Sequence, residues 1–213
     1  MLIDLGFIDY EEAYKIQKDL VIKRKAGVIE DTVILAEHAP VFTIGRTGKR
    51  ENIFEDDTSL ARRAIKVLRV ERGGDVTFHG PGQLVGYPVI DLKRRGKDLH
   101  KYLRSLEDVV IRFLNCYSVA GQRRQGKTGV WVEDKKISSI GIAATDWVTF
   151  HGLSINVNMD LSFFSMMRPC GMSDIEVTSL DRVLRRRIDI AQARNALAAS
   201  FCDLFGMGRR DVG

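Results

Sequence analysis

The residue of this chain best suited to nucleophilic chemistry is Cys170, a cysteine that the local sequence places at a bend. Cys170 lies between Pro169 and Gly171, and this pair predicts a bend that no regular helix or strand continues through. If this cysteine is exposed, the positive charge of the neighbouring Arg168 would favour its thiolate, which is the nucleophilic form. The local sequence leaves two alternatives open for Cys170, a nucleophile and a structural thiol.

A second candidate is Lys136, which opens the strand predicted over Ile137–Ala143. A lysine at the start of a strand is usually a solvated end. If its side chain instead entered a pocket beside Cys170, it would stabilise the thiolate and could exchange protons with an incoming amine. The spacing of the two residues shows only that the fold would have to bring them together. Lys135 is the neighbour that strand alternation sends to the opposite face.

The stretch from Arg72 to Pro88 contains five glycines and has the composition of a binding loop. Glycine allows positive φ and close approach of the backbone to another group. Arg72 adds a fixed positive charge, and His79 adds a group that titrates near neutrality. The alternative is an ordinary pair of hairpin turns, which would need only one or two glycines. A further bend with small residues is predicted at His151-Gly152.

Neither a phosphate-loop match nor the spacing of the histidines supports a further binding site. Residues 121–128 match the phosphate-loop pattern, but that motif requires a helix to begin at its lysine, and Gly129–Glu133 predicts a strand. The four histidines lack His-x-x-x-His spacing and an acidic pair, so we expect no metal site. Cys116 and Cys202 follow apolar residues on predicted helices, and we expect both in the core.

Composition indicates one globular domain over residues 1–213, with 45% hydrophobic and 29% charged residues. Three widely spaced cysteines argue against a disulfide framework and fit a reducing compartment. No secretory leader is evident, and no apolar run approaches the ~18 residues of a membrane span. We therefore expect a cytoplasmic protein that does not engage a membrane.

The net charge of +5 would favour an acidic partner, either a small protein or nucleic acid. Solvated basic faces are an equally good interpretation of each cluster taken singly. Nothing resembles a helix-turn-helix or a zinc finger, so nucleic acid is not supported as a partner. The basic clusters are Arg62-Arg63, Lys93–Arg95, Arg123-Arg124 and Arg185–Arg187.

The elements that would position these residues are helices at both ends of a long β section. Asp9, Asp98 and Asp189 predict the starts of three long helices, with Gly27 and Gly206 ending the first and last. A short helix is expected over Leu60–Ile65. We expect an α+β fold with a mixed or antiparallel sheet and its helices on one side. The expected strands are Thr32–Glu37, Val41–Gly45, Val67–Glu71, Leu84–Asp91, Gly129–Glu133, Ile137–Ala143, Trp147–Phe150 and Leu153–Val157, the last two separated by His151-Gly152.

Taken together, several blocks resemble the lipoyl(octanoyl) transferases in sequence and in order. They span the chain to about residue 182, and the last thirty residues add little. No single block decides the resemblance. The blocks are Arg72–Pro88, Gly129–Val132, Lys136–Gly141, His151-Gly152, Asn156-Val157, Pro169–Gly171 and Thr178–Leu180.

The resemblance implies a fold of the biotin- and lipoate-protein-ligase type and an acyltransferase without a cofactor. Such an enzyme moves an octanoyl or lipoyl group from acyl carrier protein to a lysine of a lipoyl domain. The implied acceptors are the E2 subunits of 2-oxoacid dehydrogenases and the H protein of glycine cleavage. An ATP-dependent lipoate or biotin protein ligase of the same fold is the first alternative. A non-catalytic module that binds nucleic acid through the basic surface is the second.

The resemblance also assigns roles to residues. Cys170 would be the acyl-accepting nucleophile, and Lys136 would lower its pKa and act as the general base. Ser154 stands where the family pattern leads us to expect alanine, which affects acyl-chain preference. Val85 and Leu153 could line the acyl tunnel or belong to the core. The implied substrate contacts are Arg72, Gly73, Gly74, Asp75, Val76, Thr77, Phe78, His79, Ser139, Ile140, Gly141, Gly152, Leu153 and Ser154.

Overall fold

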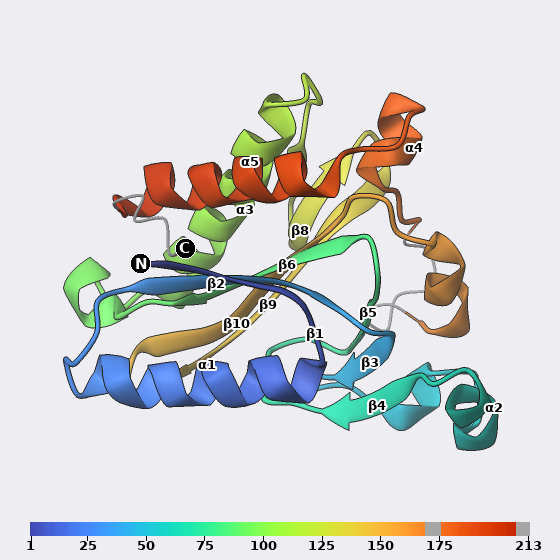
Figure 1. The fold of residues 1–213 in the computed structure, drawn as a ribbon, viewed down its shortest axis with the longest axis horizontal. Helices are drawn as coiled ribbons and strands as arrows, with labels where there is room; N and C mark the ends of the chain where they lie inside the picture. Colours follow the sequence, from blue (N-terminus) through green and yellow to red (C-terminus); the bar gives the residue numbers. More distant parts are fainter. Residues whose placement is uncertain (169–175, 208–213) are drawn as a thin grey trace.

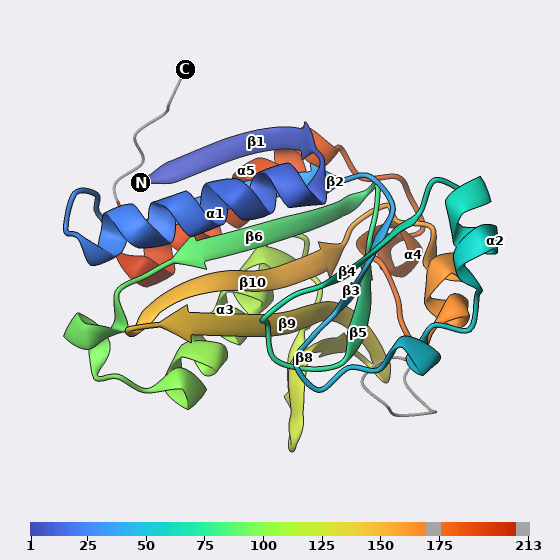
Figure 2. The same cartoon turned by 90° about the horizontal axis from the view of Figure 1, so that it is seen from below.

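The structure, a computed structural model, describes residues 1–168 and 176–207. Its centre is a seven-stranded sheet in the order β1-β2-β6-β10-β9-β8-β7, visible in Figure 2. Neighbouring strands run antiparallel except β1 and β2, which are parallel, so the sheet is mixed as expected. The strands are β1 (Leu2–Ile8), β2 (Thr32–His38), β6 (Gln83–Val89), β7 (Gln122–Arg124), β8 (Lys127–Val132), β9 (Lys135–Thr145) and β10 (Val148–Asn156).

A three-stranded sheet stands beside one end of the large sheet, in the order β4-β3-β5 (Figure 1). Its strands are β3 (Val41–Ile44), β4 (Lys66–Arg69) and β5 (Val76–His79). Because β5 pairs with β3 whereas β6 pairs with β2 and β10, the glycine-rich stretch joins two sheets. It does not fold as a pair of hairpin turns. A short helix, α2 (Asp57–Arg62), connects β3 to β4.

Helices cover both faces of the large sheet, so the expectation of helices on one side is wrong. Figure 1 shows α1 (Tyr10–Lys25) under the sheet and α3 (Leu99–Asn115) and α5 (Ile190–Phe205) over it. The central strands are apolar on both faces, which requires two covers. In β2, Val33 and Leu35 belong to the core beneath α3 and α5, whereas Ile34 and Ala36 pack with the α1 residues.

Aspartate caps start the long helices, as the sequence predicts. The carboxylates of Asp9, Asp98 and Asp189 accept backbone N–H bonds in the first turns of α1, α3 and α5. Helix α2 begins at Asp57 and ends at Arg62, not at the expected Leu60–Ile65. The reason is that Asp56 accepts from the Ser59 N–H and starts the helix earlier. The remaining helices are α4 (Leu180–Leu184) and the 3-10 turns η1 (Arg50–Asn52), η2 (Leu92–Arg95) and η3 (Leu161–Met166).

Strand β10 passes through the expected break at His151 without interruption. His151 pairs with Ile142 of β9 despite a φ of 56°, a left-handed conformation that is uncommon for residues other than glycine. Strand β10 pairs with β6 only from Leu153 onward. Gln17 of α1 therefore accepts the His151 N–H through its Oε1 at 2.9 Å. A helix side chain thus replaces the missing strand partner.

The phosphate-loop match is structurally excluded, because residues 122–132 form the β7–β8 hairpin and no helix begins at Lys127.

Cys202 is buried as expected, but Cys116 is exposed. Cys116 follows the last residue of α3 and its Sγ lies 3.5 Å from the Arg112 carbonyl, so it caps a helix end and does not fill the core. Within the described residues, no helix has the length and apolar character needed to cross a membrane.

Candidate active site

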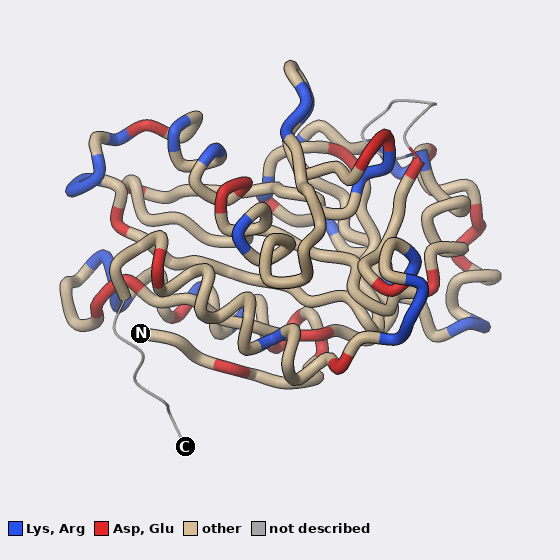
Figure 3. The backbone as a smooth tube through the Cα atoms, turned by 90° about the horizontal axis from the view of Figure 1, so that it is seen from above, with Lys and Arg blue, Asp and Glu red and all other residues tan. Residues whose placement is uncertain are grey.

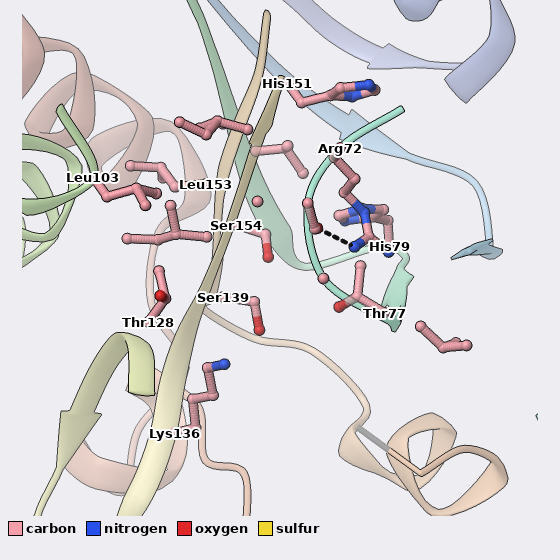
Figure 4. A pocket seen from close by; sticks show the side chains of 18 of the residues that line it. Arg72, Thr77, His79, Leu103, Thr128, Lys136, Ser139, His151, Leu153 and Ser154 are labelled. Atoms are coloured by element: carbon pink, nitrogen blue, oxygen red, sulfur yellow. Dashed lines mark hydrogen bonds between the residues drawn. The ribbon is translucent and has the colours of Figure 1, made fainter. Parts of the chain in front are cut away.

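A cavity of about 340 Å³ lies between the central strands β6, β9 and β10 of the large sheet and the glycine-rich loop over residues 72–75 that precedes β5. Figure 4 shows Lys136, Ser139 and Ser154 pointing from β9 and β10 toward the side occupied by Thr77 and His79. Most of the predicted substrate-contact residues line this cavity, although their role stays a prediction. Those that line it are Arg72, Gly73, Gly74, Val76, Thr77, His79, Ser139, Ile140, Gly141, Gly152, Leu153 and Ser154.

Asp75 and Phe78 are the two predicted contacts that do not line the cavity. Phe78 points to the opposite face of β5, where its ring stacks on Phe163 with centroids 4.4 Å apart. The Asp75 carboxylate is buried and accepts bonds from the Lys49 N–H and from Asn52 Nδ2. Both residues support the loop from behind.

Lys136 reaches the cavity because β9 contains a β-bulge. Val130 of β8 pairs with Ser138, but the next residue, Trp131, pairs with Lys136, so two residues of β9 oppose one step of β8. Without this extra residue, strand alternation would send Lys136 and Ser139 to opposite faces. With it, both side chains enter the same cavity (Figure 4). Lys135 points away, is half exposed and pairs with Glu176 at 3.1 Å.

The surroundings of Lys136 are closely packed. Its side chain is only 6% exposed, and its Nζ lies 5.3 Å from the centroid of the Trp131 ring. Its backbone pairs with the segment around Val177, because the Lys136 N–H donates to the Glu176 carbonyl and the Lys136 carbonyl accepts from the Thr178 N–H. This ladder fixes the start of β9 beside the chain that follows residue 175.

Cys170 and its neighbours Pro169 and Gly171 lie outside the described residues. Met167 and Val177, each one residue beyond the described residues that flank segment 169–175, both line the cavity. Met167 is bridged to Ile53. The described chain on both sides of residues 169–175 therefore reaches the cavity.

Arg72 holds the glycine-rich loop against the small sheet. Its buried guanidinium donates to the Thr43 carbonyl at 2.6 Å and Oγ1 at 2.9 Å, and to the Gly73 carbonyl at 3.0 Å. On the other side, the Gly73 N–H donates to the Ile142 carbonyl of β9 at 2.8 Å. A side chain at Gly141 would approach the Gly73 carbonyl to 3.0 Å, so this glycine allows the close contact.

Two buried histidines, His79 and His151, line the cavity. A third, His38, lies against His79 with ring centroids 6.1 Å apart, and all three are neutral at pH 7. Burial lowers the pKa of His79 to about 3, with further repulsion from His38 and Arg72. Burial also lowers the pKa of His38 to about 4. The pKa of His151 falls to about 3 through burial and then through the charge of Arg72. The expected near-neutral titration of His79 is therefore wrong, because desolvation disfavours the charged ring.

Neutral histidines leave the positive charge of the cavity to three residues of its described lining, Arg72, Lys127 and Lys136. No carboxylate occurs in that described lining. Such a cavity favours a thiolate or a developing oxyanion over a cationic group. Among residues 1–168 and 176–207, no group of three or more His, Cys, Asp or Glu side chains is arranged to hold a metal ion.

Several lining residues escaped the sequence analysis. Tyr10 is the first residue of α1 and stacks on His79, with ring centroids 5.6 Å apart. Tyr87 donates to or accepts from His38 Nε2 at 2.7 Å. Trp131 was noted only as part of a motif, and its periodicity on β8 is that of any core residue. Val85 and Leu153 both line the cavity and belong to the core, so the two alternatives were not exclusive.

Comparison with known proteins defines the class to which this fold and cavity correspond. Residues 9–202 match the model of the lipoyl protein ligase A/B catalytic domain. The chain belongs to this family. Among solved structures, a bipartite lipoate protein ligase from Thermoplasma acidophilum superposes with a TM-score of 0.74 over 99% of this chain and 85% of its own, at 17% identity. Lipoate-protein ligase A bound with ATP gives a TM-score of 0.78 over 99% and 87%, at 16% identity. The expected ligase-type α+β fold is thereby confirmed.

Curated relatives define the branch of the family more narrowly. The octanoyltransferase of Geobacter metallireducens is 45% identical over 201 residues, covering 94% of this chain and 91% of the relative. The octanoyltransferase of Geotalea uraniireducens is 46% identical over 200 residues, covering 94% and 90%. The resemblance to the lipoyl(octanoyl) transferases is therefore confirmed.

Proposed function

We propose that this protein is an octanoyltransferase of lipoate biosynthesis that carries the acyl group on Cys170 and uses Lys136 as its general base. The relatives named octanoyltransferase cover 94% of the chain, which supports the activity itself. The observation that carries the residue assignment is the position of Lys136. It lies in the cavity whose walls include Met167 and Val177, the described residues that bracket the sequence around Cys170. We treat residues 1–213 as one catalytic domain.

Chain connectivity supports the pairing of these two residues. Met167, which lines the cavity, precedes Cys170 by three positions in the sequence. Lys136 is tied on the other side to Val177 by the backbone ladder. The two ends of the segment that contains Cys170 are thus anchored at the cavity that Lys136 enters.

The first half of the proposed reaction moves the acyl group from one sulfur to another. The Cys170 thiolate attacks the carbonyl of the octanoyl thioester, and the carrier thiolate leaves and takes up the proton of the Lys136 ammonium, so that Lys136 becomes a neutral amine. A nearby lysine ammonium favours the thiolate, which is otherwise a minor form at neutral pH. One thioester replaces another, so the step is close to balanced in energy and needs no ATP.

The second half moves the acyl group from sulfur to nitrogen. The neutral amine of an acceptor lysine attacks the Cys170 thioester, the amide forms, and the Cys170 sulfur leaves. Lys136 accepts the proton that the attacking nitrogen releases. Amide formation makes this step favourable. Because the described lining contains no carboxylate, the cations Arg72 and Lys127, joined by Lys136 once it has accepted the proton, set the charge around the oxyanion.

The partners follow from this chemistry. The donor is octanoyl-acyl carrier protein, and the acceptors are the lipoyl domains of 2-oxoacid dehydrogenase E2 subunits and the glycine cleavage H protein. Both are protein surfaces presenting a long flexible arm, which suits a cavity open between two sheets. No bound cofactor enters either step.

The fold is shared with a ligase bound to ATP, so the test must separate transfer from ATP-dependent activation. We would incubate the protein with a lipoyl domain and either octanoyl-acyl carrier protein without ATP, or free octanoic acid with ATP and Mg²⁺. Transfer predicts octanoylated domain in the first mixture only. Product in the second mixture alone would show a ligase and overturn the proposal.

A further inference from the structure

A buried carboxylate lies on α3, the helix whose Leu103 lines the cavity of the proposed active site. Glu107 of α3 is only 1% exposed. Its Oε2 accepts from Arg104 Nη1 at 2.7 Å and from Arg123 Nε at 2.8 Å. Its Oε1 accepts the backbone N–H of Gly129 at 3.2 Å. One oxygen therefore serves an ion-pair cluster and the other holds a single peptide group of β8.

Gly129, the residue held in this way, lies directly under the side chain of Lys136. Its φ of 133° is a conformation that glycine adopts and other residues avoid. A Cβ at this position would lie 2.7 Å from Lys136 Cε and 2.6 Å from the Ser138 carbonyl oxygen. The lysine stem therefore occupies the space that the missing side chain leaves.

The far side of the lysine is bounded by Trp131, two residues further along β8. Its ring centroid lies 5.3 Å from Lys136 Nζ, and the ring itself is buried. A cation facing an aromatic ring is attracted to it. Gly129 under the stem and Trp131 beside the amine thus confine the Lys136 side chain from two positions of the same strand, β8.

We propose that Glu107 is a positioning residue for Lys136: by holding the Gly129 peptide it fixes the strand over which the lysine stem passes. This inference rests on the proposed function, in which Lys136 moves the proton. Glu107 does not touch the substrate. It acts through Gly129 on the direction in which the Lys136 amine enters the cavity.

A purely structural role for Glu107 makes a different prediction. An ion cluster that only stabilises the fold can often be replaced by apolar residues without loss of stability or function. Positioning instead requires an acceptor for the Gly129 N–H, whatever happens to stability. Small displacements of a catalytic group can cost up to about 100-fold in rate.

The first experiment is a double-mutant cycle between Glu107→Met and Lys136→Ala, read as the single-turnover rate of octanoyl transfer. In the protein with Lys136, Glu107→Met should lower this rate by about 10- to 100-fold while KM for the octanoyl carrier changes by less than about twofold. In the Lys136→Ala background it should have no further effect. Equal losses in both backgrounds would overturn the positioning role. A normal rate in Lys136→Ala alone would instead contradict the proposed role of Lys136.

The second measurement does not depend on activity. The chain has two tryptophans, and Trp147→Phe leaves Trp131 as the only one. Its emission should change in Lys136→Met, because the ammonium lies over its ring. Glu107→Met should change it in the protein with Lys136 but not in Lys136→Met. An emission spectrum unaltered by Glu107→Met would show that the lysine has not moved, which contradicts the proposal.

Two further variants separate the positioning role from a general effect of the ion-pair cluster and from a failure to fold. Asp108→Asn is the matched control, because Asp108 pairs with Arg123 at 2.6 Å but is not a partner of Gly129, and it should leave rate and emission unchanged. If Glu107→Met fails to fold, the triple variant Arg104→Met, Glu107→Met, Arg123→Met removes all three charges together. It should fold and still show the slow rate. A folded triple variant with normal transfer would overturn the proposal.

Discussion

At the scale of single residues, two adjacent lysines show how local backbone geometry turns one side chain toward solvent and the next into the cavity. Lys135 is half exposed and paired with Glu176, whereas Lys136 is 6% exposed and lines the cavity. The sequence alone predicts their opposite directions through strand alternation. It does not predict which of the two faces inward, because that depends on the bulge between β8 and β9.

Replacing these two lysines in turn tests the assignment of the base. Lys136→Ala should lower the rate of octanoyl transfer by about 100- to 10,000-fold, the usual contribution of a positioned acid or base. Lys135→Ala should leave the rate unchanged, since that side chain points to solvent. The measurement is product formation on a lipoyl domain, followed by mass. A Lys136→Ala enzyme as fast as its Lys135→Ala control would remove the residue from the mechanism.

At the scale of elements, the cavity depends on the close approach of β10 and β6. A Cβ at Gly152 would lie 2.1 Å from the Gly86 carbonyl oxygen and 2.6 Å from Pro88 Cδ. Both are parts of the neighbouring strand, so neither can move aside easily. The glycine is therefore needed for strand packing, independently of its proposed contact with an acyl chain.

We therefore expect Gly152→Ala to destabilise the fold by about 3 kcal/mol, at the upper end of overpacking costs. Gly73→Ala is the matched control, because the nearest atom to its added Cβ is the Ile142 carbonyl oxygen at an ordinary 3.7 Å. Urea unfolding midpoints of the two variants measure the difference. Equal midpoints would mean that β6 and β10 are not as closely packed as described here.

Most elements could be predicted from the sequence because their signals are local. The caps Asp9, Asp98 and Asp189 each act within one helical turn of their own position. The two-sided covering of the sheet and the continuous β10 could not, since both depend on distant partners. In particular, the strand continues through His151 only because Gln17, on α1, accepts its N–H.

The same division holds for the candidate site. The segments 72–79, 139–141 and 152–154, each of which contains glycine, mark the walls of the cavity in the sequence, and most of their residues line it. Tyr10 and Tyr87 carry no local signal, because they reach the cavity through tertiary packing. Asp75 and Phe78 show the converse error, since a contiguous motif was taken whole. Strand alternation turns Phe78 to the other face of β5, and hydrogen bonds from Lys49 and Asn52 hold the Asp75 carboxylate away from the cavity.

At the scale of the whole molecule, charge is distributed differently on the surface and in the interior. Figure 3 shows basic and acidic residues interspersed along the backbone. Ion pairs partly neutralise some of the basic clusters. Arg123 pairs with Glu107 and Asp108, and Arg124 pairs with Asp134. The interior instead holds three histidines without charge. These buried rings link the stability of the fold to pH.

Stability should fall as the pH is lowered from 7 to 5. The pKa values of His38, His79 and His151 are lowered to about 4, 3 and 3, below the value of about 6.5 in the unfolded chain. Between these values the unfolded chain binds more protons, so acid favours unfolding. Each histidine should cost about 2 kcal/mol at pH 5, from 1.36 kcal/mol per pH unit.

His151→Asn tests this linkage, because asparagine tolerates the positive φ of this position. Urea unfolding at pH 7 and pH 5 should show a pH-dependent loss about 2 kcal/mol smaller than in the parent protein. His100→Asn is the control, since His100 is exposed on α3 and should leave the pH dependence intact. A pH dependence unaltered by His151→Asn would show that His151 does not titrate as described.

The central claim is that the acyl group rests on one particular sulfur, and intact-mass measurement tests it most directly. The protein would be incubated with octanoyl-acyl carrier protein without an acceptor. The account predicts one octanoyl adduct on the parent protein and on the Cys116→Ser and Cys202→Ser variants, and none on Cys170→Ser. An adduct that persists in Cys170→Ser, or no adduct on any of these proteins while transfer proceeds, would contradict it.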